Sequence, residues 1–440
     1  MASLDSLPSE ILLQIFHQSP PQELCRLSFV CKRLGFIASS CLWRDIELHE
    51  RGYHESSAEI THSPPYRTAP RHYNDSSRRG WQSDICIRAE KLFALLQSLH
   101  AHDEARLKQL ASRVRSLCTV IEPSWQSEVD RLSHPISIWN ILPYFTRLES
   151  LELHGSSVAL RHGNVDLHLR DAQPLANLKF ARLFAYIPRY VATYVLRSNA
   201  SLERLELGML DAPKLGGVGI DSVDNLNFDG QNTYMTGVIP RSLGGFFSDC
   251  SPSFRNLRYL HLCQPCNSRG DYFNQMNAWS ACAEKTALKS WENILIASRQ
   301  SLETLVIDQR PGAGVEDNEG FSEEEFLNSG TSGIGNKAFI DSIGSMLTSE
   351  SDLPRLSQVY LYGFIVRSPL RRMPSEETPG DTFLHDLERR GVRCEARRGK
   401  WCLFDQESGT ASWAKWNGDG CSNLHDEYMG VRWYTVLANT

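Results

Sequence analysis

Few residues in this chain have the types and spacing that chemistry requires. Cys263 and Cys266 form the only Cys-x-x-Cys pair, a spacing found in zinc sites. A zinc site needs further ligands, and only His261 and Cys282 lie near this pair in the sequence. We therefore predict no metal and no other cofactor, and we interpret the twelve cysteines as reduced thiols rather than a disulfide framework.

Complete phosphate-binding and catalytic motifs are also absent from the sequence. Residues 330–335, Gly-Thr-Ser-Gly-Ile-Gly, precede a stretch of helical character, but no Lys-Ser or Lys-Thr pair follows them. The sequence contains no G-x-S-x-G, H-E-x-x-H or G-x-G-x-x-G motif. We predict that the protein is not an enzyme, the alternative being an enzyme with an unfamiliar site in the C-terminal tail or the insertions.

Charge and hydropathy exclude two classes of partner. The 440 residues contain 46 Lys and Arg against 52 Asp and Glu, a net charge of −6, and no dense basic stripe for nucleic acid. No run of 18 apolar residues occurs, and the first ten residues lack the pattern of a signal peptide. We expect no nucleic-acid or membrane partner and a location in the cytoplasm, the nucleus or both.

A six-residue pattern, Leu-x-x-Leu-x-Leu or close to it, recurs along the middle of the chain. Its copies are Leu148–Leu153, Leu178–Leu183, Leu202–Leu207, Leu257–Leu262, Leu302–Ile307 and Leu356–Leu361, after a weaker start at Val114. Each copy has the alternation of a short strand with one buried face, and most come after a stretch of helical character. One strand and one helix cannot bury their own apolar faces, so neighbouring units must stack into a parallel sheet with helices outside.

This pattern resembles leucine-rich repeats. The resemblance implies an α/β fold, an irregular solenoid with a parallel sheet on its concave side. The spacing between copies varies from 24 to 55 residues, and the long intervals contain insertions rich in Gly with Asp, Asn or Glu at residues 216–245 and 311–335.

Residues beside the inward leucines should face the concave side, because side chains alternate along a strand. Aromatic and Arg residues are frequent at these positions, as they are in protein interfaces. The residues predicted to contact a target protein are Phe180, Arg182, Phe184, Tyr259, His261, Tyr360 and Tyr362. The alternative is that the insertions bury some of these aromatic residues.

The first fifty residues predict three short helices. Pro8 suits a first helical turn, Pro20 and Pro21 separate two helices, and a third runs from Cys31 toward Trp43. Ile11, Leu12, Ile15 and Phe16 would give the first helix an apolar stripe wider than so short a bundle can bury. A bundle of about 40 residues is near the lower limit for independent folding, so this surplus indicates a permanent partner.

The order of these residues, from Leu7 to about Leu48, resembles the F-box. The resemblance implies that certain residues both pack the bundle and dock a Skp-type adaptor of cullin-RING ubiquitin ligases. These residues are Leu7, Pro8, Ile11, Ile15, Leu24, Leu27 and Val30. The chain departs from the family at Leu34, where a Trp is frequent.

Together the two resemblances suggest a fungal-type F-box and leucine-rich-repeat substrate receptor. The predicted domains are an F-box at residues 1–48, a polar insertion or linker at 49–84, the solenoid at 85–390 and a Trp-rich cap at 391–440 with a hairpin. We expect the substrate-recognition subunit of an SCF-type ligase, which would bind an unknown target protein through the repeats. The alternative is an interaction scaffold without ubiquitination activity.

Overall fold

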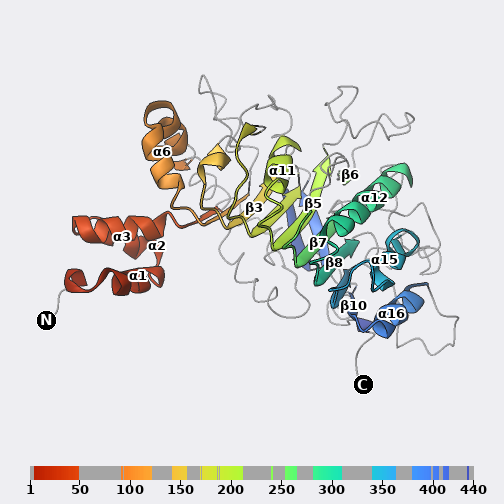
Figure 1. Cartoon of the computed structure of the whole chain (residues 1–440). Coiled ribbons are helices and arrows are strands. Elements are labelled where there is room, and N and C mark those ends of the chain that lie inside the picture. Colours follow the sequence, from red (N-terminus) through yellow and green to blue (C-terminus); the bar gives the residue numbers. More distant parts are fainter. Residues whose placement is uncertain are drawn as a thin grey trace, which may run out of the picture.

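The structure is a computed structural model in which a helical bundle precedes a long sheet whose strands largely follow chain order (Figure 1). It describes residues 4–48, 91–92, 94–120, 141–155, 169, 171–185, 187, 189–211, 239–240, 253–264, 281–309, 339–362, 379–397, 400–405, 410–415 and 434–435. The predicted polar segment at 49–84 lies outside these residues. Within them, no helix combines the length and apolarity needed to span a membrane.

The bundle consists of three helices after a short 3-10 turn, η1 (Leu4–Ser6). The helices are α1 (Ser9–His17), α2 (Pro21–Ser28) and α3 (Lys32–Leu42). Pro21 begins α2, where its missing N–H costs nothing, and Cys31 caps α3 by accepting a hydrogen bond from the Leu34 N–H. The helices enclose a small core of Leu12, Phe16, Leu24, Leu34, Ile37 and Ala38.

Gly35 sets the distance between α2 and α3. A Cβ atom at this position would lie 2.6 Å from the backbone oxygen of Ser28. Ala is ordinarily preferred over Gly inside a helix by about 1 kcal/mol, so Gly35→Ala tests whether the close contact dominates. We expect Gly35→Ala to destabilise the bundle and to make amide hydrogen exchange in α2 and α3 at least about fivefold faster. Unchanged or slower exchange in the full-length protein would contradict this packing.

Among the described residues, nine strands pair in parallel to form the sheet. Their order is β1 (Asp45–Leu48), β2 (Ser116–Val120), β3 (Ser150–Gly155), β4 (Phe180–Ala185), β5 (Arg204–Asp211), β7 (Tyr259–Gln264), β8 (Thr304–Gln309), β9 (Gln358–Tyr362) and β10 (Arg393–Arg397). Two further strands are antiparallel: β6 (Ile239–Pro240) pairs with β5, and β13 (Tyr434–Thr435) pairs with β10.

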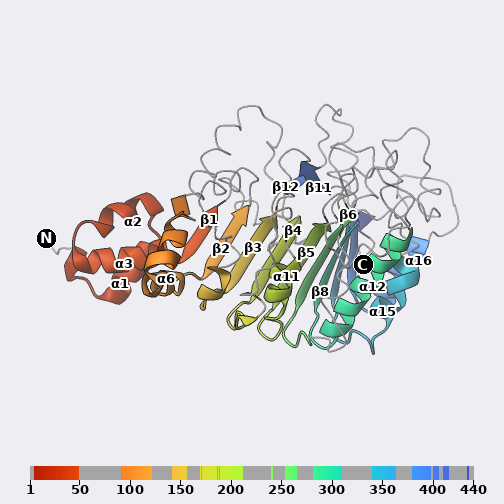
Figure 2. The same ribbon diagram turned by 90° about the horizontal axis from the view of Figure 1, so that it is seen from above.

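The leucine pattern explains one face of the sheet. In each of the six copies, the three apolar residues that define the pattern are buried. They form one continuous core with the helices that connect the strands. These helices lie along one side of the sheet (Figure 2) and are α6 (Glu104–Ala111), α11 (Arg189–Leu196), α12 (Ala281–Ser298), the π-helical η9 (Ile340–Gly344), α15 (Ser345–Thr348) and α16 (Pro379–Arg389). The expected parallel sheet with helices outside is present.

The insertions predicted at residues 216–245 and 311–335 lie outside the described residues, apart from Ile239 and Pro240 of β6. The strands β5, β7 and β8 end at Asp211, Gln264 and Gln309, and the chain next re-enters the parallel sheet at Tyr259, Thr304 and Gln358. The parallel register nevertheless continues from β5 through β7 and β8 to β9.

The ends of the sheet differ from the domain boundaries predicted above. The strand β1 already belongs to the sheet although it lies within residues 1–48, and β10 continues the sheet beyond residue 390. The predicted hairpin is present as β11 (Lys400–Asp405) and β12 (Thr410–Lys415), which pair antiparallel. The strand β12 lies against β3 and β4, so this part of the C-terminal segment returns to the middle of the sheet.

Candidate protein-docking surfaces

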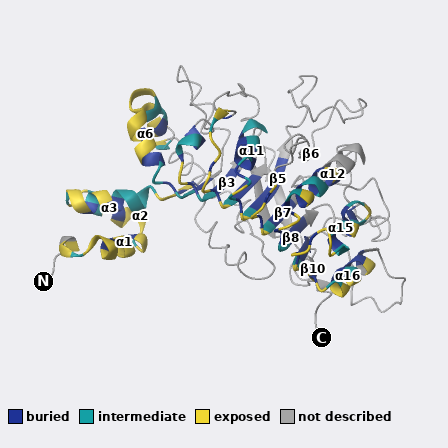
Figure 3. Cartoon of the chain, in the orientation of Figure 1, coloured by how far each residue is buried: buried dark blue, intermediate teal, exposed yellow. Residues whose placement is uncertain are grey.

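Exposed apolar side chains concentrate on the N-terminal bundle. Among the described residues, the exposed large hydrophobic residues outside the bundle are Leu95 and Ile296. Those on the bundle are Leu4, Ile11, Leu13, Ile15, Phe29, Val30 and Phe36. In Figure 3 the helices α1 and α3 carry long exposed stretches. Apolar surface gathered in this way on so small a unit is typical of an interaction site.

The helix α1 places its apolar residues on two faces. Leu12 and Phe16, one turn apart, are fully buried in the bundle core. Ile11 and Ile15, also one turn apart, are 41% and 39% exposed on the neighbouring face. The apolar stripe of this helix is therefore wider than the bundle buries.

A second group of apolar residues lies where α2 meets α3. Phe29, the residue after α2, is 89% exposed, and Val30 beside it is 65% exposed. Phe36, on α3, is also exposed. These side chains contribute no hydrophobic stabilisation while they face water. A partner that covered them would gain about 25 cal/mol for each Å² of apolar surface removed from water.

The structure separates the seven residues predicted to pack the bundle and dock an adaptor. Pro8, Ile11, Ile15 and Val30 are exposed, so they are accessible to a partner. Leu24 is buried in the bundle core, while Leu7 and Leu27 are half-buried against it. The prediction did not include Leu4, Leu13, Phe29 and Phe36. Helical spacing could have placed Leu13 and Phe36 on solvent faces, but no signal in the sequence marks Phe29.

The second candidate surface is the sheet face opposite the inward leucines. Strand register places one side chain from each of six strands in a single row on this face. The row is Glu152, Arg182, Glu206, His261, Val306 and Tyr360, and every member is between 0% and 3% exposed. Arg182, His261 and Tyr360, which were predicted to contact a target protein, are therefore buried members of this row.

Ion pairs and ring contacts order this face of the sheet. Arg182 Nε lies 3.6 Å from Glu206 Oε2, and Arg204 Nη2 lies 2.6 Å from Glu206 Oε1. The Arg204 guanidinium lies over the rings of Phe180 and Tyr259, at 5.4 and 4.0 Å from their centroids. Cation–π contact with two rings and a charged hydrogen bond fix this guanidinium.

Phe180, Arg204 and Tyr259 belong to another row on this face, and all three are half-buried. The side chains of Phe184 and Tyr362, which were also predicted to contact a target, lie outside the described residues. Cys266 of the possible zinc pair lies outside them too. In the described part of the chain, no three His, Cys, Asp or Glu residues are grouped as metal ligands.

Comparison with known proteins bears on the bundle. The F-box-like family matches residues 4–49, the segment that contains η1, the three helices and β1. No curated protein matches the chain significantly. F-box domains in general bind Skp-type adaptors in cullin-RING ligases. Residues 4–49 are therefore an F-box-like domain, and the described residues that follow it are built on a parallel sheet.

Proposed function

We propose that this protein is the substrate-recognition subunit of an SCF-type cullin-RING ubiquitin ligase. The observation that carries the proposal is the exposed apolar surface of the F-box-like domain, made by Ile11 and Ile15 on α1 and by Phe29 and Val30 after α2. A Skp-type adaptor covering this surface would connect the chain to the ligase.

The sheet supplies the second half of the proposal. We interpret its repeated Leu-x-x-Leu-x-Leu strands as an irregular leucine-rich-repeat solenoid that holds a target protein. Binding both the adaptor and the target raises the effective concentration of the target's lysines near the ubiquitin-charged enzyme. In this mechanism the chain acts in the cytoplasm or nucleus by proximity and makes no covalent bond itself.

Target contact is proposed at the half-buried row of the sheet. Phe180 and Tyr259 sandwich Arg204, and aromatic and Arg side chains that are already fixed lose little entropy when a partner binds. Arg182, His261 and Tyr360 are buried beneath the chain, so we assign them to the support of this row rather than to direct contact.

Affinity purification with mass spectrometry, with and without a proteasome inhibitor, tests this proposal. We expect the wild-type protein to retain a Skp-type adaptor, a cullin and one or more proteins that accumulate only when the proteasome is inhibited. The double variant with Phe180→Ala and Tyr259→Ala should still bind the adaptor. It should no longer bind the proteins that accumulate only when the proteasome is inhibited. Retention of the same proteins by the double variant would place target recognition elsewhere. Adaptor binding without any inhibitor-dependent protein would favour a scaffold without ubiquitination activity.

A further inference from the structure

The bundle and the sheet have separate hydrophobic cores. Leu42, the last residue of α3, packs against the bundle core, whereas Trp43 packs against the core of the sheet. Only Trp43 and Arg44 stand between the end of α3 and the first residue of β1. The orientation of the bundle relative to the sheet must therefore be set by contacts at this short junction.

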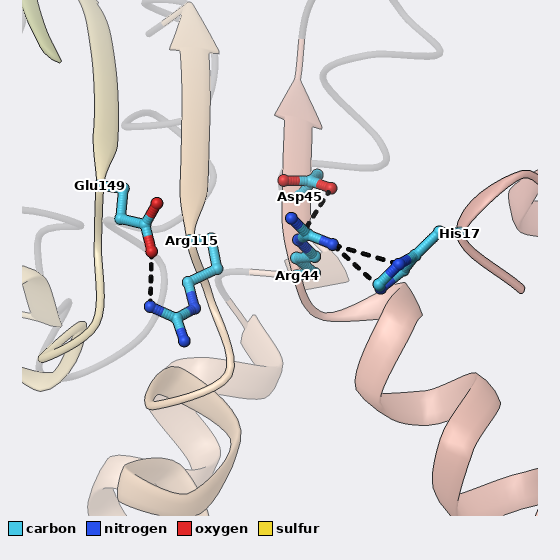
Figure 4. Close-up of polar contacts among 5 residues, drawn as sticks. All are labelled: His17, Arg44, Asp45, Arg115 and Glu149. Carbon is cyan, nitrogen blue, oxygen red and sulfur yellow. Dashed lines mark hydrogen bonds and ion pairs between the residues drawn. The ribbon is translucent and has the colours of Figure 1, made fainter. Parts of the chain in front are cut away.

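Arg44 is bonded to both sides of the junction. Its backbone N–H donates to the Cys41 oxygen in α3 at 3.2 Å, and its backbone oxygen accepts from Arg115 and Ser116 at the start of β2, at 2.7 and 3.1 Å. Its side chain turns back toward α1, where Nη1 lies 2.9 Å from His17 Nε2 (Figure 4). One residue thus connects two helices of the bundle to the sheet.

An acidic side chain, that of Asp45, lies beside the Arg44 guanidinium on the sheet side. Arg44 Nε lies 3.9 Å from Asp45 Oδ2. Burial raises the pKa of Asp45, and the positive charge of Arg44 opposes this effect. Further along the same edge, Arg115 Nη1 lies 2.6 Å from Glu149 Oε1 and ties the start of β2 to the residue before β3 (Figure 4).

Arg113 makes a second bridge from the sheet side. It precedes β2, and its Nη1 donates to Ser39 Oγ of α3 at 3.3 Å. The same guanidinium lies 5.5 Å from the centroid of the Phe36 ring, one turn earlier on α3. Partial burial lowers the pKa of Arg113, but an arginine remains charged at neutral pH. The contact with α3 therefore combines a hydrogen bond with cation–π attraction.

We propose that Arg44 and Arg113 are positioning residues that hold the F-box-like domain at a fixed orientation to the sheet. Their side chains reach α1 and α3 respectively, so together they oppose rotation of the bundle about the short connection. The consequence for ubiquitination rests on the proposed function, since a fixed orientation would hold a target at a constant distance from the ligase. The orientation itself does not depend on that function.

Single-molecule energy transfer in the full-length protein tests the positioning role. The chain has twelve cysteines, so the dyes are attached through unnatural amino acids at exposed Gln22 on α2 and exposed Ala176 before β4. We expect one narrow distance distribution for the wild type. Arg44→Ala with Arg113→Ala should broaden it or add a second population, without change in circular dichroism.

Arg26→Ala is the matched control. Arg26 is an exposed arginine of the same bundle that pairs with Glu23 at 2.7 Å, away from the junction. This variant should leave the wild-type distance distribution unchanged. If the Arg44 and Arg113 variant unfolds, each single variant is measured instead, and at least one must broaden the distribution. An unchanged distribution in folded variants would overturn the positioning role.

A second measurement separates the positioning role from the proposed function. The folded Arg44→Ala variant should bind a Skp-type adaptor with wild-type affinity, because the Arg44 side chain bonds to His17 and Asp45 at the junction. The single variant is used here because Arg113 lies over the ring of Phe36, one of the exposed apolar residues. Absence of adaptor binding by the wild type would refute the proposed function and leave the distance result intact. A broadened distance distribution together with fully retained target ubiquitination would show that orientation has no effect on transfer and would overturn the inferred consequence.

Discussion

Replacing Ile11 and Val30 together by aspartate should abolish binding of a Skp-type adaptor and leave the chain folded. Ile11 is 41% and Val30 65% exposed and neither belongs to the bundle core, so the substitutions remove little from that core. In a complex they would bury two charges against apolar surface, at a cost of several kcal/mol. We expect the dissociation constant, measured by calorimetry with purified adaptor, to rise more than about 100-fold.

The control for this experiment is Ile296→Asp. Ile296 on α12 is 43% exposed, close to the exposure of Ile11, but it lies outside the F-box-like domain. The control should bind the adaptor as the wild type does. Leu24→Asp is unsuitable because Leu24 is a core residue and its loss would unfold the bundle. Wild-type affinity in a folded Ile11 and Val30 variant would contradict the proposed docking surface.

The second large effect is expected at Arg182, on the sheet face opposite the helices. Arg182 and Glu206 are both almost fully buried and lie 3.6 Å apart. Removing one partner of a buried pair leaves the other charge without compensation and typically costs about 3–5 kcal/mol. Since Arg204 still pairs with Glu206, we expect Arg182→Ala to lower the free energy of unfolding by about 3 kcal/mol. Urea denaturation of the full chain measures this loss.

Arg258→Ala provides the comparison for Arg182. Arg258 is 67% exposed and lies 3.9 Å from Glu303 just before β7 and β8. An exposed pair of this kind contributes about 0–1 kcal/mol, so its removal should change stability little. Equal and small effects of the two substitutions would mean that the row of Arg182 faces solvent, as the sequence alone had suggested.

Local periodicity made much of the architecture predictable. The leucine spacing identified six of the parallel strands because a buried face repeats every second residue, whatever the length of the insertion after the strand. The three N-terminal helices were predictable because their signals are also local. Pro8 and Pro21 mark helix starts, and the apolar spacing repeats within one or two turns.

The remaining features depend on contacts between distant segments. The strand β1 was missed because its pattern, Asp-Ile-Glu-Leu, has only two inward residues and lies directly after a helix. The row from Glu152 to Tyr360 contains polar and aromatic residues that suit a solvent-facing strand surface, and nothing in their spacing indicates that the chain covers them. The division of α1 between core and exposed residues likewise depended on how α2 and α3 pack against it.

Reconstituted ubiquitination tests the central claim most directly. The reaction contains the purified chain, a Skp-type adaptor, the cullin-RING module and a ubiquitin-charged conjugating enzyme. Its substrate is a co-purified protein that accumulates only when the proteasome is inhibited, and ubiquitin transfer to it is followed on gels. The account predicts transfer with the wild-type chain and with Ile296→Asp, and none with the Ile11 and Val30 variant. Transfer that is equal with and without the chain, or unaffected by the Ile11 and Val30 variant, would contradict a receptor that works by joining target and ligase.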